Sequence, residues 1–206
     1  MKDSTLPKMF LIAGLSLLLG ISILSLGGCL AAEDLPFSWP VAYTIEYTQT
    51  KPGDPARYIY MVSGNKVRNE LVSLNGKPAS NVIIFDLDKQ TMISILPNIQ
   101  VSHESSLANK GVKLQHMFDA SGTWKKMVTE EVNGMKAEKY KITYDKPEDF
   151  IFVWLSQGIR SPLQMTNRDG TLFREVHRYV AGAVGENNFT VPSGYHKDNP
   201  APERPL

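Results

Sequence analysis

The stretch VAYTIEYT at residues 41–48 alternates bulky apolar side chains with small or polar ones. The bulky positions are Val41, Tyr43, Ile45 and Tyr47. A period of two residues places such side chains on one face of an extended strand, and aromatic and β-branched residues suit that pleated surface. The stretch therefore predicts a β-strand with one buried face, which makes a mainly β fold the first hypothesis.

The same alternation recurs further along the chain, at Tyr58, Tyr60 and Val62 and again at Tyr140, Ile142 and Tyr144. Dipeptides typical of tight hairpins separate such runs, among them Asn75-Gly76, Asn133-Gly134 and Asp169-Gly170. Asn-Gly and Asp-Gly supply the positive φ that two-residue turns need. We therefore expect about nine or ten strands, joined mostly by hairpins into an antiparallel sheet.

Two runs are apolar at both odd and even positions: VIIF at residues 82–85 and FIFVWL at residues 150–155. A strand of this kind is covered on both faces, or it lines a cavity on one of them. Aromatic and methionine side chains suit a cavity because they are broad or adaptable, although they also build ordinary cores. The candidate residues for binding a hydrophobic ligand are Phe85, Met92, Phe152 and Trp154.

One segment, residues 105–119, is the best candidate for a helix. Its apolar residues form an uneven stripe at helical spacing, and Gly111 weakens the pattern. A curved sheet with this helix lying against one face would account for the pattern of the whole chain.

The N-terminus has the three parts of a secretory signal. Lys2 and Lys8 are basic, residues 9–26 carry no charge, and Leu26-Gly27-Gly28-Cys29 follows. Small residues before a cysteine resemble the lipobox of bacterial lipoproteins, in which the thiol of that cysteine is acylated. Length alone leaves a retained membrane anchor open, because a spanning helix needs about 20 residues.

The expected organisation has four parts. Residues 1–28 are a lipoprotein signal peptide, residues 29–40 a lipidated tether, and residues 41–196 one β domain. Residues 197–206 carry three prolines among charges and are expected to be a disordered tail. Cys29 is the only cysteine, so no disulfide can form within the chain.

Charge argues against nucleic acid as a partner. The whole chain has a formal charge of +1, and loss of Lys2, Lys8 and Asp3 with the signal peptide leaves none. No basic excess then remains to neutralise phosphates. Membrane attachment is instead expected from acyl chains on Cys29, and stable anchoring takes two or more of them.

Motifs that carry chemistry are missing from the sequence. The four histidines do not have metal-ligand spacing, and no Gly-x-Ser-x-Gly elbow or phosphate-binding glycine loop is present. Glu130-Glu131 and Glu148-Asp149 are adjacent carboxylates, which point to opposite faces of a strand. We therefore expect no catalytic residues, no metal and no cofactor, and a protein that is not an enzyme.

Several strand and turn motifs, taken in order, resemble the outer-membrane lipoprotein-sorting (LolA/LolB-like) superfamily. They are GNKVR (64–68), IFD (84–86), KQTM (89–92), EEVNGMKA (130–137), FVWL (152–155), PLQM (162–165) and FTVPSGY (189–195). The resemblance covers roughly residues 39–195 and consists of strand and turn residues rather than a catalytic signature. It implies an unclosed antiparallel β-barrel with a short helical lid over a hydrophobic cavity.

The resemblance also implies a function. Members bind acyl chains or hydrophobic segments, and the acceptor at the outer membrane is itself a lipoprotein, as Cys29 suggests here. Leu30, rather than Asp, follows Cys29, which by analogy with enteric bacteria indicates the outer membrane. The expected function is an envelope lipoprotein that binds an acyl chain or a lipoprotein, in lipoprotein sorting or outer-membrane maintenance. The alternative is a non-transferring interaction or stress-sensing module with the same fold.

Overall fold

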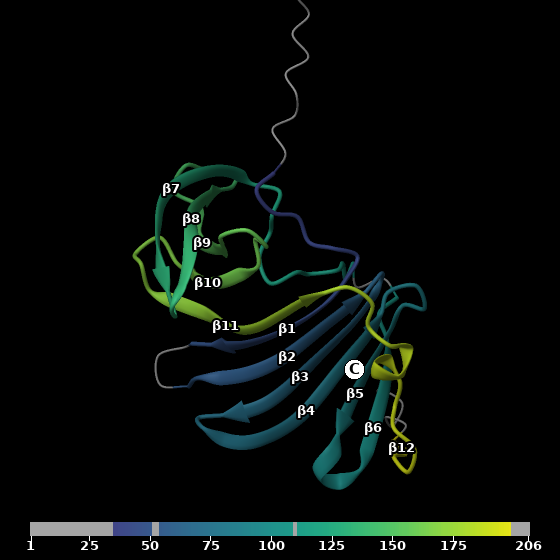
Figure 1. Cartoon of the computed structure of the whole chain (residues 1–206). Coiled ribbons are helices and arrows are strands. Elements are labelled where there is room, and N and C mark those ends of the chain that lie inside the picture. The colour runs from purple at the N-terminus through teal and green to yellow at the C-terminus, as the bar shows by residue number, and fades with distance from the viewer. Residues whose placement is uncertain (1–34, 51–53, 109–110, 199–206) are drawn as a thin grey trace, which may run out of the picture. The chain divides into compact units, whose positions relative to one another are not determined.

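Alternating side chains build one large sheet in this protein (Figure 1). The computed structural model describes residues 35–50, 54–108 and 111–198. Within them lie the twelve strands β1 (Ala42–Gln49), β2 (Ala56–Ser63), β3 (Lys66–Leu74), β4 (Lys77–Asp86), β5 (Thr91–Leu96), β6 (Val101–Ser106), β7 (Thr123–Val132), β8 (Met135–Thr143), β9 (Phe150–Ser156), β10 (Pro162–Thr166), β11 (Leu172–Ala181) and β12 (His196–Asp198). Their order in the sheet is β12-β6-β5-β4-β3-β2-β1-β11-β10-β9-β8-β7.

The mainly β, unclosed fold expected from the sequence is confirmed. Every neighbouring pair is antiparallel except β12 and β6, and β7 and β12 remain as the two edges. The β3–β4 and β7–β8 hairpins turn at Asn75-Gly76 and Asn133-Gly134, where all four residues have positive φ. The strand count exceeds the expected nine or ten because short strands such as β12 carry no periodic signal of their own.

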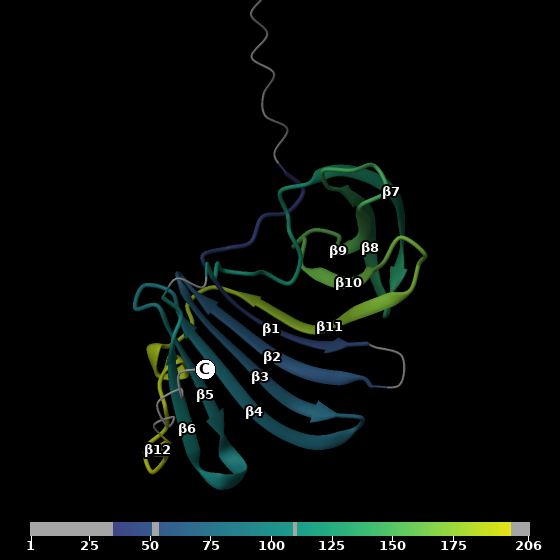
Figure 2. The same cartoon turned by 180° about the vertical axis from the view of Figure 1, so that it is seen from behind.

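The sheet is strongly curved, and the two ends bend differently (Figures 1 and 2). Strands β1–β6 form an open trough, while β7–β10 curl back beyond β11. We call the face that carries Tyr43, Ile45 and Tyr47 the inner face. One inner row runs across paired strands as Tyr43, Val62, Val67, Phe85 and Met92.

The main hydrophobic core lies on the inner face and joins the two ends of the sheet. Tyr43 and Ile45 of β1 are completely buried in it, as are Val153 of β9 and Met165 of β10. Aromatic side chains surround these residues, and Trp39 stacks on Tyr43 with a centroid distance of 4.8 Å. Burial of so many apolar side chains is the main stabilising contribution to the fold.

A second cluster covers the outer face of β4 and β5. Val82, Ile84 and Ile95 are buried there against Phe189 of the 3₁₀ turn η2 (Glu186–Phe189). This arrangement explains why residues 82–85 are apolar at both odd and even positions. Val82 and Ile84 face the C-terminal segment, and Ile83 and Phe85 face inward.

The expected helix at residues 105–119 is wrong. Strand β6 continues to Ser106, and the described residues from there to β7 form no helix. We call residues 107–122 the crossing segment, of which residues 109–110 are not described. Where the sequence hypothesis placed a short helical lid, the described residues form an irregular segment.

The ends of the β domain also differ from the expected boundaries. Phe37 is buried and Trp39 packs on the core, so the part of the tether from residue 35 onward belongs to the folded unit. Lys197 and Asp198, expected in the tail, pair with β6 as part of β12. Another 3₁₀ turn, η1 (Pro97–Ile99), links β5 and β6.

Residues 1–34, which include Cys29, lie outside the described part of the chain, so the structure does not test the signal peptide or the lipidation site. In the residues that are described, no helix is long and apolar enough to cross a membrane.

Candidate functional site

A cavity of about 450 Å³ lies between the inner face and the crossing segment. Its walls come from β1–β4, β11 and residues 112–117. The lining residues are Tyr47, Gln49, Tyr60, Val67, Asn69, Ile83, Phe85, Leu87, Val112, Lys113, Leu114, Gln115, His116, Met117 and Arg174. The volume falls within the range of about 300–1,000 Å³ that is typical of small-molecule sites.

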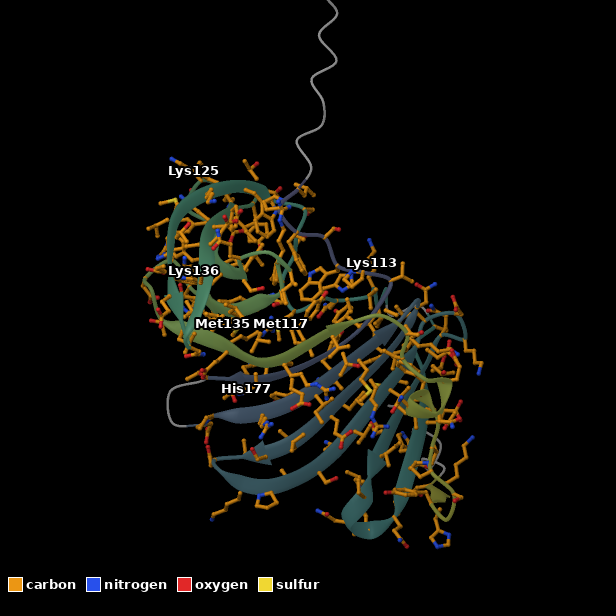
Figure 3. All side chains as sticks on the ribbon, viewed as in Figure 1. Lys113, Met117, Lys125, Met135, Lys136 and His177 are labelled. Atoms are coloured by element: carbon orange, nitrogen blue, oxygen red, sulfur yellow. The ribbon has the colours of Figure 1, made fainter. Side chains whose placement is uncertain are left out.

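The crossing segment forms the outer wall of this cavity, and Figure 3 labels Lys113 and Met117 on it. Val112, Leu114 and His116 are half-buried, and the residues between them are exposed. This is the alternation of a strand, and Gly111 precedes it with a φ of +61°. The alternation ends at Met117 and Phe118, which are both buried.

Side chains of the sheet and of residue 39 hold the crossing segment in place. The Tyr60 hydroxyl donates to the Gln115 carbonyl, and the Trp39 indole donates to the Phe118 carbonyl at 2.9 Å. Tyr43 and His116 share a hydrogen bond of 2.9 Å. The first two bonds satisfy backbone carbonyl groups that a helix would have paired internally. The wall is thus attached at a few points rather than by a ladder.

One partly buried cation faces into the cavity. Arg174 of β11 lies over the rings of Tyr47 and Phe173, at 5.7 and 5.6 Å from their centroids. Its Nε atom is buried without a hydrogen-bond partner, and so is the Oδ1 atom of Asn69. In the residues described, no carboxylate forms an ion pair with Arg174.

Burial sets the electrostatics of the cavity. It lowers the pKa of Arg174, and the nearby Tyr47 and Tyr60 partly oppose that effect. Burial also raises the pKa of both tyrosines, so their hydroxyls stay protonated. It lowers the pKa of His116, against a smaller opposite effect of Asp119. At neutral pH the cavity therefore contains a charged arginine and uncharged tyrosines.

The four residues expected to flank one cavity are not brought together. Phe85 lines the cavity. Met92 pairs with Phe85 across β4 and β5, on the same face, but is not part of the lining. Phe152 and Trp154 lie on the opposite face of β9 from the core residues Val153 and Leu155.

Phe152 and Trp154 instead belong to a small separate cluster. Trp154 is buried with Val132, Ala137 and Leu163, and its indole donates to Glu130. The amine of Lys139 lies 4.6 Å from the Phe152 centroid and 4.5 Å from the Trp154 centroid. A lysine stem therefore covers the second face of β9, where the sequence suggested a ligand.

The sequence hypothesis missed the crossing segment and Arg174. A readable signal existed for the segment, because Val112, Leu114 and His116 alternate with more polar residues. Arg174 carried no such signal, since its orientation depends on an irregularity in β11.

Histidines and carboxylates do not gather into a metal site in the described part of the chain. No group of three or more His, Cys, Asp or Glu side chains there is arranged to hold a metal ion. His177, labelled in Figure 3, hydrogen-bonds to Thr48 at 2.7 Å. His103 lies 3.3 Å from the backbone oxygen of Asp198.

Two solved structures of low sequence identity resemble this chain. An uncharacterised conserved protein from Thermus thermophilus superposes with a TM-score of 0.51 and 8% identity, over 77% of this chain and 90% of that one. A domain from Vibrio parahaemolyticus, named for outer-membrane lipoprotein sorting, has a TM-score of 0.32 and 12% identity, over 74% and 90%. No protein-family model and no curated protein matches the chain. The likeness to the Thermus protein supports the fold alone.

Proposed function

We propose that this chain is a lipid-anchored protein of the cell envelope that binds a hydrophobic ligand, an acyl chain, in the cavity behind the crossing segment. The observation that carries the proposal is the cavity itself, with Phe85, Ile83 and Val67 on its sheet side and Leu114 and Met117 on the other. The protein acts as a binding protein and not as an enzyme. A role in lipoprotein sorting or outer-membrane maintenance, facing the periplasm, belongs to the same proposal.

Acyl-chain burial supplies enough free energy for such a role. Each methylene that leaves water contributes about 0.8 kcal/mol, so several of them offset the cost of association. Ile83 and Phe85 are only half-buried in the unliganded sheet, and therefore retain apolar surface that a chain would cover. A ligand that completes their burial stabilises the folded state in proportion to its affinity.

Access to the cavity is explained by the way its outer wall is attached. Met117 and Phe118 anchor the C-terminal part of the crossing segment in the main core. The described residues before them are held to the sheet by few hydrogen bonds, such as that from Tyr60 to Gln115. Local opening of residues 112–116 then breaks few bonds and leaves the sheet ladder intact. A segment of this kind admits a long chain without unfolding of the β-sheet.

Photo-crosslinking in vesicles tests the proposal. The full chain is reconstituted into phosphatidylcholine vesicles with photoactivatable hexadecanol or palmitate, and crosslinked peptides are mapped by mass spectrometry. We expect crosslinks in β4 and in residues 112–117. Ile83→Trp should weaken them by narrowing the cavity, whereas Ile159→Trp, at a position that is 82% exposed, should not.

Two outcomes would count against this function. Crosslinks spread evenly over exposed residues would indicate contact with bulk lipid only. Equal crosslinking of β4 in the wild type and in Ile83→Trp would show that the cavity is not the binding site. Circular dichroism of both variants ensures that loss of labelling does not reflect loss of the β-sheet.

A second candidate, a protein-interaction module, is favoured by the edge strand β7. Almost all of β7 is exposed, with Met127 and Val128 about half-exposed, and Met135 is similar at the adjoining turn (Figure 3). An open edge can accept a strand from a partner. This function needs no empty cavity, so the Ile83→Trp variant would leave it intact.

A further inference from the structure

The cavity contains a positive charge for which the surrounding residues provide no counter-ion. The lining residues include Arg174, which is buried at Nε, and Lys113, which is exposed on the crossing segment. None of the lining residues is Asp or Glu. The described part of the chain thus surrounds Arg174 with aromatic rings and uncharged polar groups.

An extra residue in β11 directs Arg174 inward. Glu46 pairs with Arg178 and Tyr47 pairs with Val176, so His177 is a bulge with no partner on β1. A bulge of one residue shifts the alternation of side chains to the other face. In a regular strand, Arg174 and Arg178 would lie on the same face, because four residues separate them. The bulge instead places Arg174 on the inner face, opposite Gln49, while Arg178 lies on the outer face.

Arg178 shows what the outer face offers an arginine. Its guanidinium lies 3.5 Å from a Glu46 oxygen and is largely exposed. Without the bulge, Arg174 would share that solvated, acidic surface. The fold instead places a cation where desolvation opposes its charge.

Unpaired buried charge destabilises a folded protein, and a bound anion removes that effect. The lining of the cavity also includes groups that can donate hydrogen bonds, namely the hydroxyl of Tyr47 and the side-chain amides of Gln49 and Asn69. The amide of Asn69 can turn its NH₂ group toward an anion, since its oxygen has no partner to lose. Together these groups can accommodate a small planar anion.

We infer that the ligand is a fatty acid, an amphiphile with one negative charge, whose carboxylate binds the guanidinium of Arg174 while its chain lies along Ile83, Phe85 and Leu114. The inference rests on the proposed function, because it names the ligand class of the same cavity. A guanidinium matches a carboxylate through two parallel hydrogen bonds. Of the two cations in the lining, only Arg174 has a buried nitrogen, since Lys113 is exposed, and one buried guanidinium matches a single charge better than the nearly two charges of a phosphate monoester.

Headgroup selectivity in the full chain tests the inference. The chain in phosphatidylcholine vesicles is crosslinked with photoactivatable palmitate or photoactivatable hexadecanol, and unlabelled palmitate or hexadecyl phosphate competes. We expect palmitate to label the cavity peptides about tenfold more strongly than hexadecanol, from the usual strength of a hydrogen bond to a charged group. Palmitate should also compete better than hexadecyl phosphate.

Variants of the two arginines separate binding from folding. Arg174→Gln should lower palmitate labelling to the level of hexadecanol and leave hexadecanol labelling unchanged, which also shows that the cavity is intact. Arg174→Lys should keep part of the preference, because it retains the charge without the planar fork. Arg178→Gln, on the same strand but facing outward, should label as the wild type does.

The possible failures are distinguishable. Equal labelling by both probes, or an equal loss of both in Arg174→Gln, would overturn the fatty-acid inference and leave acyl-chain binding standing. Stronger competition by hexadecyl phosphate would replace the carboxylate by a phosphate. Absence of cavity labelling by either probe would overturn the proposed function as well.

Discussion

Gly122 shows how closely the crossing segment approaches the sheet where it joins β7. A Cβ atom on Gly122 would lie 2.7 Å from Cγ2 of Ile142 and 2.8 Å from the carbonyl oxygen of Thr143. Ile142 is completely buried and the second contact is backbone, so neither neighbour can move aside easily. A side chain at this position would push the segment away from β8.

Gly122→Ala should therefore destabilise the protein by about 1–3 kcal/mol, the usual cost of overpacking. Chemical denaturation followed by circular dichroism measures the change. Gly185→Ala is the matched control, since its Cβ would lie 3.6 Å from Nδ2 of Asn188, an ordinary contact. We expect the control to stay within about 0.5 kcal/mol of the wild type. Equal stability of both variants would show that the segment is not fixed at Gly122.

At the residue scale, the sequence predicts the positions of the strands better than it predicts the contacts between side chains. Phe85 belongs to a run with two apolar faces, and it is among the residues that line the cavity. Trp154 belongs to a similar run, yet Leu163 and the stem of Lys139 cover its second face. Periodicity shows that a face must be covered, but the covering group depends on contacts between distant strands.

Arg174 could not be assigned from the sequence for a related reason. The alternation in β11 places Arg174 and Arg178 on one face as long as the strand is regular. The bulge at His177 reverses this, and nothing in the local sequence marks a bulge at that residue. The most informative polar residue of the cavity is thus visible only in the paired sheet.

At the scale of the elements, the crossing segment has no regular secondary structure in its described residues, yet it forms one wall of the cavity. Its uneven apolar stripe predicts a helix, but the half-buried residues Val112, Leu114 and His116 have a period of two. Gly111 at positive φ and the aromatic donors of the sheet favour the extended form. Tertiary contacts outweigh local propensity here, as they commonly do for weak helical patterns.

His116 makes this segment sensitive to pH. Burial lowers its pKa in the folded protein from the ordinary 6.5, while the unfolded chain keeps the ordinary value. Below about pH 6.5 the unfolded state therefore binds more protons than the folded state, and the free energy of unfolding decreases. The hydrogen bond between His116 and Tyr43 links this titration to the wall of the cavity.

The melting temperature should consequently fall as the pH is lowered from about 8 to about 5, with a component that His116→Gln removes. Amide hydrogen exchange in residues 112–118 should increase over the same range. His177→Gln is the control, because His177 lies on β11 and bonds to Thr48 of the sheet. An identical pH dependence in His116→Gln and the wild type would show that His116 does not cause the loss of stability at low pH.

At the scale of the whole molecule, each face of the open trough is partly covered by a segment that is not a strand of the trough. One of these segments lies between β6 and β7, and the other follows β11. The crossing segment covers the inner face, and the C-terminal segment around Phe189 covers the outer face of β4 and β5. The period of two and the Asn-Gly turns predicted an antiparallel sheet, and the resemblance to the lipoprotein-sorting superfamily implied that this sheet is unclosed. The sequence did not predict the C-terminal cover, since residues 182–195 have no period.

The folded unit begins at Leu35, and its core includes Phe37 and Trp39. Its described residues include no helix that could cross a membrane. We expect attachment to a membrane through residues before Leu35, where Leu26-Gly27-Gly28-Cys29 resembles a lipobox. Stable attachment of this kind needs two or more acyl chains, because one gives only marginal, reversible binding.

Cys29→Ser should abolish incorporation of radiolabelled palmitate and move the chain from the membrane fraction to the soluble fraction, or leave it as the uncleaved precursor. The reason is that only the thiol of Cys29 can accept a thioether-linked lipid, and the chain has no other cysteine. Gly28→Ala is the control, since a small residue remains before the cysteine and labelling should persist.

Equal labelling of wild type and Cys29→Ser would show that the lipid is attached elsewhere. Membrane retention of an unlabelled, uncleaved Cys29→Ser chain would instead indicate that residues 9–26 can act as an anchor before cleavage.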